Sequence, residues 1–285
     1  MSMISTIKVN KGKKAYPIMM ERYTNAAEMV RDLRTRPITN SSFDDQRTKG
    51  IDTDWVGAKS YDECLEYLEK GYQPTVDTLR TALKPTVGTT KRISFKNDIV
   101  GGMPIVPLAM MNLPNAMINT YIKPIKAKVI DIYYDMGCSW TVKSKDIIEA
   151  GQKLLATIMK FEQEGYKFNL YAVQSYCSSD DADILAIKVK SSSQPVDLKR
   201  MSYALTHTSF FRVLGFDWYS KTPKGKYRHG YGHAISVECD NDPQRTNEFA
   251  KQIFGNNSIY LSAMIMNKSY KDNKDEYIST MINPK

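Results

Sequence analysis

The run Ala127-Lys-Val-Ile-Asp-Ile-Tyr-Tyr134 decides the fold of this chain. Its β-branched and aromatic residues are typical of a β-strand. A long amphipathic helix is expected over Lys145–Glu164 with Gly165 as its stop, and a second strand over Lys167–Val173. Strand, helix and strand in this order predict a βαβ unit, in which the two strands are parallel neighbours joined by a right-handed crossover.

The same alternation continues towards the C-terminus. Strands are expected at Asp183–Lys190, Gly215–Tyr219 and Ile235–Cys239, helices at Pro195–Leu205, Ser209–Leu214 and Arg245–Ile253, and a last apolar stretch at Ser258–Met266. Strands that alternate with helices predict an α/β fold with a doubly wound sheet. Ligands of such sheets bind beyond the carboxyl ends of the strands, which directs attention to the loop that follows Tyr134.

The chain before this sheet divides into two further parts. Residues 1–97 predict a smaller, mainly helical region, in which Ile4–Val9 is a short edge-like β segment, Thr24 caps a helix over Asn25–Arg34, and Ser60-Tyr-Asp-Glu63 is a capping box that starts another. Residues 98–125 are rich in Pro, Met and Gly and predict an extended, buried connector, because proline excludes a regular helix or a central strand. Residues 126–285 then form the α/β domain.

Composition limits the class of protein. The chain has 285 residues, of which 42% are hydrophobic and 25% charged, a balance typical of globular proteins. It lacks an uninterrupted apolar stretch long enough for a membrane span, and its N-terminus lacks a signal-peptide pattern, so a cytoplasmic protein without a membrane partner is expected. The net charge of +9 would attract phosphates and acidic proteins alike. Four scattered cysteines predict free thiols.

The loop Asp135-Met-Gly-Cys-Ser139 resembles the metal-ion motif of the von Willebrand factor A family. That family begins with a hydrophobic strand and an Asp-x-Ser-x-Ser motif, followed by a long helix and a second strand. Asp135 and Ser139 match the first Asp and the last Ser, whereas Gly137 replaces the middle Ser and removes one oxygen ligand, which water would replace. The resemblance implies a degenerate site for Mg²⁺ or another divalent cation at Asp135 and Ser139. The same two residues also fit a plain turn and helix cap.

Further motifs between residues 55 and 233 resemble phage-encoded proteins of unknown function that carry an A-like C-terminal half. They are Trp55-x-Gly57-x-x-Ser60…Glu63…Gly71-Tyr72, Val106-Pro107…Leu113-Pro114…Met117, Glu162-x-x-Gly165-Tyr166, His207–Phe216 and Gly230-Tyr-Gly232. This resemblance implies a phage or mobile-element origin and a place in the host cytoplasm, and it brings no established activity with it.

A basic loop with tyrosines is a candidate nucleic-acid site. Its cations could neutralise phosphates while a tyrosine stacks on a base, although glycine beside tyrosine equally suits a plain turn. The candidate residues are Lys221, Lys224, Lys226, Tyr227, Arg228 and Tyr231.

Motifs for nucleotide enzymes and serine hydrolases, GxxxxGK[ST], GxGxxG and GxSxG, do not occur in the chain. His229, His233 and Cys239 could form a loop metal site, and His207 could pair with Cys138 or Cys177, but a structural role at a helix end suits His207 better. The preferred hypothesis is therefore a protein-binding or assembly module acting on a phage or host protein rather than an enzyme. A nucleic-acid-binding protein and a metal-dependent enzyme are the alternatives, and the sequence leaves the oligomeric state open.

Overall fold

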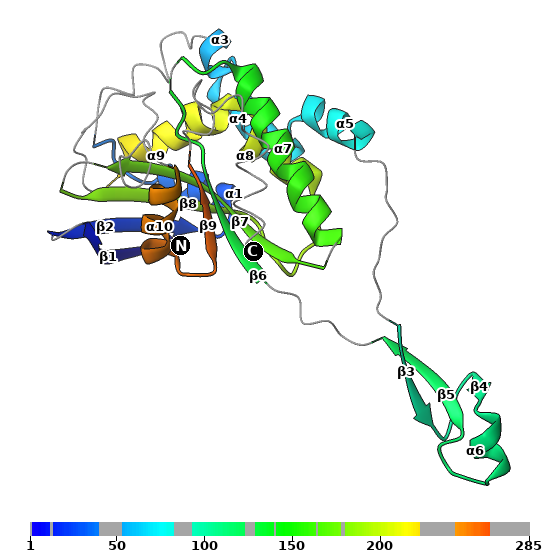
Figure 1. Cartoon of the computed structure of the whole chain (residues 1–285). Coiled ribbons are helices and arrows are strands. Elements are labelled where there is room, and N and C mark those ends of the chain that lie inside the picture. The colour runs from blue at the N-terminus through cyan, green and yellow to red at the C-terminus, as the bar shows by residue number, and fades with distance from the viewer. Residues whose placement is uncertain are drawn as a thin grey trace.

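The computed structural model describes residues 2–11, 14–39, 53–82, 93–122, 129–139, 141–163, 165–177, 180–222 and 243–262. Most of them surround a six-stranded mixed sheet with the order β1-β2-β8-β7-β6-β9 (Figure 1). Its strands are β1 (Met3–Lys11), β2 (Lys14–Tyr23), β6 (Val129–Asp135), β7 (Lys167–Cys177), β8 (Ala182–Lys190) and β9 (Ser258–Leu261). The chain is thus an α/β protein, as predicted.

Helices and a second, smaller sheet complete the described chain. The helices outside the small sheet and its neighbour α6 are α1 (Ala26–Leu33), α3 (Thr53–Val56), α4 (Tyr61–Lys70), α5 (Gln73–Ala82), α7 (Ser144–Gln163), α8 (Leu198–Thr206), the π-helix η2 (Phe210–Gly215), α9 (Phe216–Ser220) and α10 (Pro243–Phe254). The small sheet has the order β3-β5-β4 and consists of β3 (Ile93–Asp98), β4 (Met103–Pro104) and β5 (Met117–Ile122), with the short helix α6 (Val106–Met110).

The predicted βαβ unit is confirmed. Strand β6 runs parallel to β7 on one side and to β9 on the other, and α7 connects β6 with β7. Asp135 is the last residue of β6, as the hydrophobic run before it predicts. Strand β8 pairs with β7 in the antiparallel direction, which makes the sheet mixed.

Hydrophobic side chains cover both faces of the main sheet, because successive residues of a strand point to opposite sides. Ile132 and Tyr134 face a core shared with α1, α7 and α8, whereas Tyr133 faces a smaller core shared with α10. Helix α7 can approach α8 closely because Gly151 has no side chain, and a Cβ there would collide with the carbonyl of Leu205. Side chains of β6 are therefore packed on both faces of the sheet.

The prediction of a mainly helical N-terminal region is wrong for its first strands. Strand β1 forms the expected edge, but β2, which the sequence did not reveal, pairs in parallel with β8 and extends the main sheet. Pro17 and the charged pair Glu21-Arg22 interrupt its apolar pattern. Pro17 is tolerated because the parallel pairing with β8 begins one residue later, at Ile18.

The strand predicted over Gly215–Tyr219 is instead the helix α9, which continues from η2. A short aromatic run buried on all sides has no periodicity that distinguishes strand from helix. The buried Trp218 shows why the helix is preferred, since its indole N–H reaches the carboxylate of Glu21 at 2.7 Å. The strand predicted at Ile235–Cys239 lies outside the described residues.

Two predicted helix starts are close to the structure. Asn25, rather than Thr24, caps α1 by accepting from the Glu28 amide. Ser60 caps α4 as predicted and accepts from the Glu63 amide at 3.1 Å. The Glu63 carboxylate reaches back to the amide of Lys59, one residue earlier than expected.

The Pro- and Met-rich stretch is not the buried connector that the sequence predicts. Residues Ile93–Ile122, called the apolar module below, form the small sheet, in which β5 pairs with β3 and β4 in the antiparallel direction (Figure 1). Proline is accommodated at its usual permitted places, since Pro104 lies in the two-residue edge strand β4 and Pro107 in the first turn of α6.

Candidate functional site

Asp135 lies at the carboxyl edge of the main sheet, but its carboxylate is fully buried. One carboxylate oxygen accepts from the Ser175 hydroxyl at 2.7 Å and from the Tyr260 hydroxyl, and the other accepts from the Gly137 amide at 2.9 Å. Its partners therefore come from β7, β9 and the following loop. The arrangement binds three segments together at the strand end where a ligand was expected.

Burial raises the pKa of Asp135 from 3.8 to about 6, although the hydroxyls of Tyr260 and Ser175 and the Gly137 amide act in the opposite direction. The folded protein thus holds this proton more tightly than the unfolded chain does. The stabilisation that comes from the protonation of Asp135 is therefore fully present below about pH 4 and decreases as the pH rises through about 6.

This shift can be measured with the variant Asp135→Asn, which does not titrate. We expect the free energy of unfolding of the wild type, minus that of the variant, to fall by about 2–3 kcal/mol between pH 4 and pH 7. Urea unfolding of both proteins across this range gives the difference. A difference that stays constant with pH would show that Asp135 titrates normally.

No hydrogen bond joins the Ser139 hydroxyl to the Asp135 carboxylate, whose partners are Gly137, Ser175 and Tyr260. The Ser139 hydroxyl lies 3.1 Å from the Thr141 hydroxyl, in the turn before α7. Among the described residues, no group of three or more His, Cys, Asp or Glu side chains is placed to hold a metal ion. The divalent-cation site stays a prediction, and the occupied carboxylate of Asp135 does not favour it. His229, His233 and Cys239 lie outside the described residues.

Arg212, in η2, joins the N-terminal region to the loop after β6. The residue is only 2% exposed. Its guanidinium donates to the carbonyls of Trp55 at 2.6 Å, Ser139 at 3.2 Å and Val142 at 3.2 Å, and it stacks on the Trp55 ring at 4.4 Å. Burial lowers its pKa, but a guanidinium remains protonated at neutral pH. A buried cation thus orients the loop through three backbone carbonyls.

The short helix α3 is fastened beside Arg212 by a second contact. The Thr208 hydroxyl donates to the Val56 carbonyl at 2.7 Å. Gly57 has a φ of +80°, a conformation that favours glycine, and a Cβ at this position would collide with the Thr208 hydroxyl. The Trp-x-Gly motif is therefore a structural contact between α3 and the segment after α8.

His207 ends α8 as predicted, but it is enclosed by aromatic rings. The centroids of Tyr67, Tyr72 and Tyr203 lie 4.9, 4.4 and 5.6 Å from its own ring centroid, and its Nδ1 lies 2.8 Å from the Ser209 hydroxyl. Burial lowers its pKa to about 4, so that the imidazole is neutral at physiological pH. The neutral imidazole therefore carries no charge that could complement the helix dipole.

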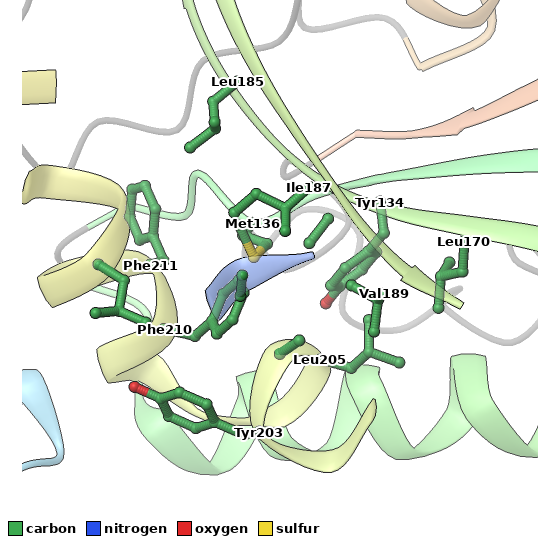
Figure 2. Close-up of a cluster of buried hydrophobic side chains, with 14 of the residues drawn as sticks. Tyr134, Met136, Leu170, Leu185, Ile187, Val189, Tyr203, Leu205, Phe210 and Phe211 are labelled. Carbon is green, nitrogen blue, oxygen red and sulfur yellow. The ribbon is translucent and has the colours of Figure 1, made fainter. Parts of the chain in front are cut away.

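His207 and Cys138 line one small cavity at the end of β6, beside the buried cluster of Figure 2. The cavity leaves about 10 Å³ for the centre of a water-sized sphere, which is room for one water molecule. Burial raises the pKa of the Cys138 thiol, whereas reactive cysteines need a lowered one. The pair has neither the space nor the protonation states of a thiolate–imidazolium nucleophile.

Among the nucleic-acid candidates, the structure describes Lys221 alone. Its side chain is 5% exposed, and its ammonium lies 3.0 Å from the carboxylate of Asp217, itself buried. This cation is therefore engaged inside the fold. Lys224, Lys226, Tyr227, Arg228 and Tyr231 lie outside the described residues, so the nucleic-acid site stays a prediction.

The apolar module carries the most unusual surface in the described part of the chain. No residue from 95 to 120 is buried. Its strongly exposed apolar side chains are Phe95, Ile99, Val100, Met103, Val106, Met110, Met111 and Leu113. Exposed apolar groups gathered in this way typically mark binding surfaces.

Comparison with protein families identifies one relationship. A family model described as a domain of unknown function, DUF7192, matches residues 7–283. The chain belongs to the DUF7192 family. No curated protein and no solved structure matches it.

In this DUF7192 protein, two features of the site could not be found from local sequence signals. Arg212 contacts Trp55 and Ser139 across more than 70 residues of chain. The exposure of the apolar module contradicts the expectation that so apolar a segment is buried. None of the helices in the described ranges combines the length and hydrophobicity required to cross a bilayer.

Proposed function

We propose that the chain is a protein-binding or assembly protein of phage or mobile-element origin, which contacts its partner through the apolar module. The α/β body, which resembles a von Willebrand factor A domain, serves as the platform. The order of β6, α7 and β7 and the position of Asp135 at the strand end agree with that resemblance.

One observation supports the proposal most strongly. Twelve large hydrophobic side chains are exposed among the described residues, and eight of them lie in the apolar module. Met110 is 82% exposed, Val100 73% and Phe95 69%. A stable isolated domain normally turns such side chains inward, because exposed apolar area costs about 25 cal/mol per Å².

The module also lacks a core of its own. A three-stranded sheet needs a packed hydrophobic face to be stable, and here no side chain from 95 to 120 is buried. Contact with a partner would supply the missing core. Methionines such as Met103, Met110 and Met111 suit this role because their unbranched side chains adapt to the surface they meet.

The buried carboxylate and the small cavity at the sheet edge favour a binding function over catalysis. Three hydrogen bonds engage both oxygens of Asp135, and the nearby cavity has room for one water molecule. A small-molecule site normally needs a cavity of several hundred Å³. The exposed module is therefore a stronger candidate for the working surface than this edge of the sheet.

Photo-crosslinking tests this proposal. We expect a photoreactive amino acid at position 110 of the full chain, expressed in its native cells, to yield one discrete crosslinked protein. The triple variant Val106→Gln, Met103→Gln and Met111→Gln, carrying the same crosslinker, should reduce the yield at least about tenfold, because three apolar contacts are lost.

The matched control replaces exposed apolar residues outside the module, with Met3→Gln and Ile38→Gln, and should leave the yield unchanged. No crosslinked protein, or crosslinking to nucleic acid instead, would refute the proposal. A yield equally reduced by the control would show that the apolar module has no special role.

A further inference from the structure

We propose that the apolar module docks into an apolar groove bordered by acidic residues on the partner protein. This chemical description of the partner rests on the proposed function.

The contact surface itself is uncharged. Residues 99–122 contain no Asp, Glu, Lys or Arg. The charges of the module are Lys96 and Asp98, and they form an ion pair with each other at 2.5 Å. Because unpaired charges are costly in the middle of an interface, the matching part of the partner must be apolar as well.

The sequence on both sides of the module is strongly basic. Residues 78–130 contain eight basic residues and one acidic residue, Asp98, so that they carry +7 of the net charge of +9. The eight are Arg80, Lys84, Lys91, Arg92, Lys96, Lys123, Lys126 and Lys128. Such a net charge acts over about 10 Å at 0.1 M salt, attracts an acidic partner and repels a second copy of this chain.

Two other kinds of partner fit the module less well. The small sheet ends in two open edges, β3 and β4, and unpaired backbone groups are not tolerated in the hydrocarbon layer of a membrane. Single-stranded nucleic acid needs aromatic rings for stacking, and Phe95 is the single aromatic among the eight exposed side chains. A protein groove tolerates both features.

Parts of the module have a restricted backbone, which suits a partner of fixed shape. Pro104 and Pro107 restrict the backbone before and within α6, and Asn112 adopts a φ of +53° just after it. A segment with a restricted backbone loses less conformational freedom on binding than a fully flexible one. Shape complementarity contributes little at a fluid surface, so this feature also favours a protein.

Two labelled peptides test the chemistry directly with the full chain. The first is an amphipathic helix of Leu, Ala and Glu, and the second has Lys in place of every Glu. In fluorescence anisotropy we expect the acidic peptide to bind at least about tenfold more tightly than the basic one, because like charges repel. Its affinity should fall at least about tenfold between about 0.05 M and 0.5 M salt.

Variants separate the two parts of the proposal. The triple variant Val106→Gln, Met110→Gln and Met111→Gln should lower the affinity for the acidic peptide at least about tenfold. The control variant Met3→Gln with Ile38→Gln should leave this affinity unchanged. Replacing Lys123, Lys126 and Lys128 with Gln should reduce the affinity about threefold or more and flatten the salt dependence.

Binding of the module to a membrane or to a second copy of the chain is measured with the same proteins. Binding to vesicles of phosphatidylcholine and phosphatidylglycerol that the triple variant loses would overturn the proposal in favour of a lipid surface. Self-association in sedimentation that the triple variant loses would overturn it in favour of a second copy. Equal binding of both peptides, or of neither, would also overturn it. If crosslinking at position 110 still captures a protein in that case, the proposed function stands and the acidic groove does not.

Discussion

Replacing Arg212 with methionine is expected to lower the free energy of unfolding by about 4 kcal/mol. The variant leaves the carbonyls of Trp55, Ser139 and Val142 without their donor inside the protein, and each such loss costs about 1–3 kcal/mol. The stacking of the guanidinium on Trp55 is lost as well. The effect is measured by urea unfolding, with circular dichroism as the signal.

Arg200 provides the matched control, because it is an exposed arginine in α8. Arg200→Met should change the free energy of unfolding by less than about 0.5 kcal/mol. If Arg212→Met does not fold, Thr208→Val removes one hydrogen bond of the same junction and should cost about 1–2 kcal/mol. A loss below about 1 kcal/mol for Arg212→Met would contradict the role assigned to this residue.

Replacing Glu21 with glutamine should have an effect of similar size, about 3–4 kcal/mol. Glu21 is fully buried in β2, where it pairs with Arg36 and accepts from the indole of Trp218 at 2.7 Å. Arg36 also contacts Asp32 at 2.5 Å and the Tyr23 hydroxyl at 3.0 Å. Without the Glu21 carboxylate, the largely buried guanidinium of Arg36 loses its main partner.

The pH dependence of this effect has a definite sign. Burial raises the pKa of Glu21, but hydrogen bonds from Arg36 and Trp218 outweigh it and hold the pKa below the usual value. The stabilisation is therefore present at neutral pH and is lost as the pH falls through the lowered pKa. The difference between wild type and Glu21→Gln should shrink on acidification, and the fluorescence of Trp218 should report the altered environment.

The control for Glu21 is Glu66→Gln. Glu66 forms an exposed ion pair with Lys70 at 3.4 Å, with side chains 65% and 69% exposed. A surface pair of this kind contributes little, so this variant should lose less than about 0.5 kcal/mol. Equal losses for Glu21→Gln and Glu66→Gln would show that burial does not strengthen the Glu21 pair.

The two residues with the largest expected effects illustrate what sequence patterns do not contain. Glu21 meets Trp218 across 197 positions of the chain, and Arg212 meets Trp55 across 157. Neither residue belongs to a motif whose spacing predicts its partner. The charged pair Glu21-Arg22 even obscured β2, because charged residues rarely occur in a central strand unless a distant partner neutralises them.

The candidate site shows the same limit. The position of Asp135 at the end of a parallel strand could be predicted, because the hydrophobic run before it is a local signal. Whether its carboxylate is open to a metal ion depends on Ser175 and Tyr260, which lie 40 and 125 positions away. The hydroxyls of these two residues engage one oxygen of the carboxylate, and the Gly137 amide engages the other.

The sequence by itself determined the elements whose signals lie within a few residues: β6, α7, β7 and β8, the Ser60 cap of α4, and the alternation that makes the chain an α/β protein. Periodicity and capping are local, so they can be read directly from the chain. The tertiary structure alone decided that β2 joins the sheet, that Phe216–Ser220 is helical, that Asp135 is sealed by hydroxyls, and that the apolar module stays exposed. Each of these depends on which distant side chains compete for the same space and the same hydrogen bonds, and no local pattern records that competition.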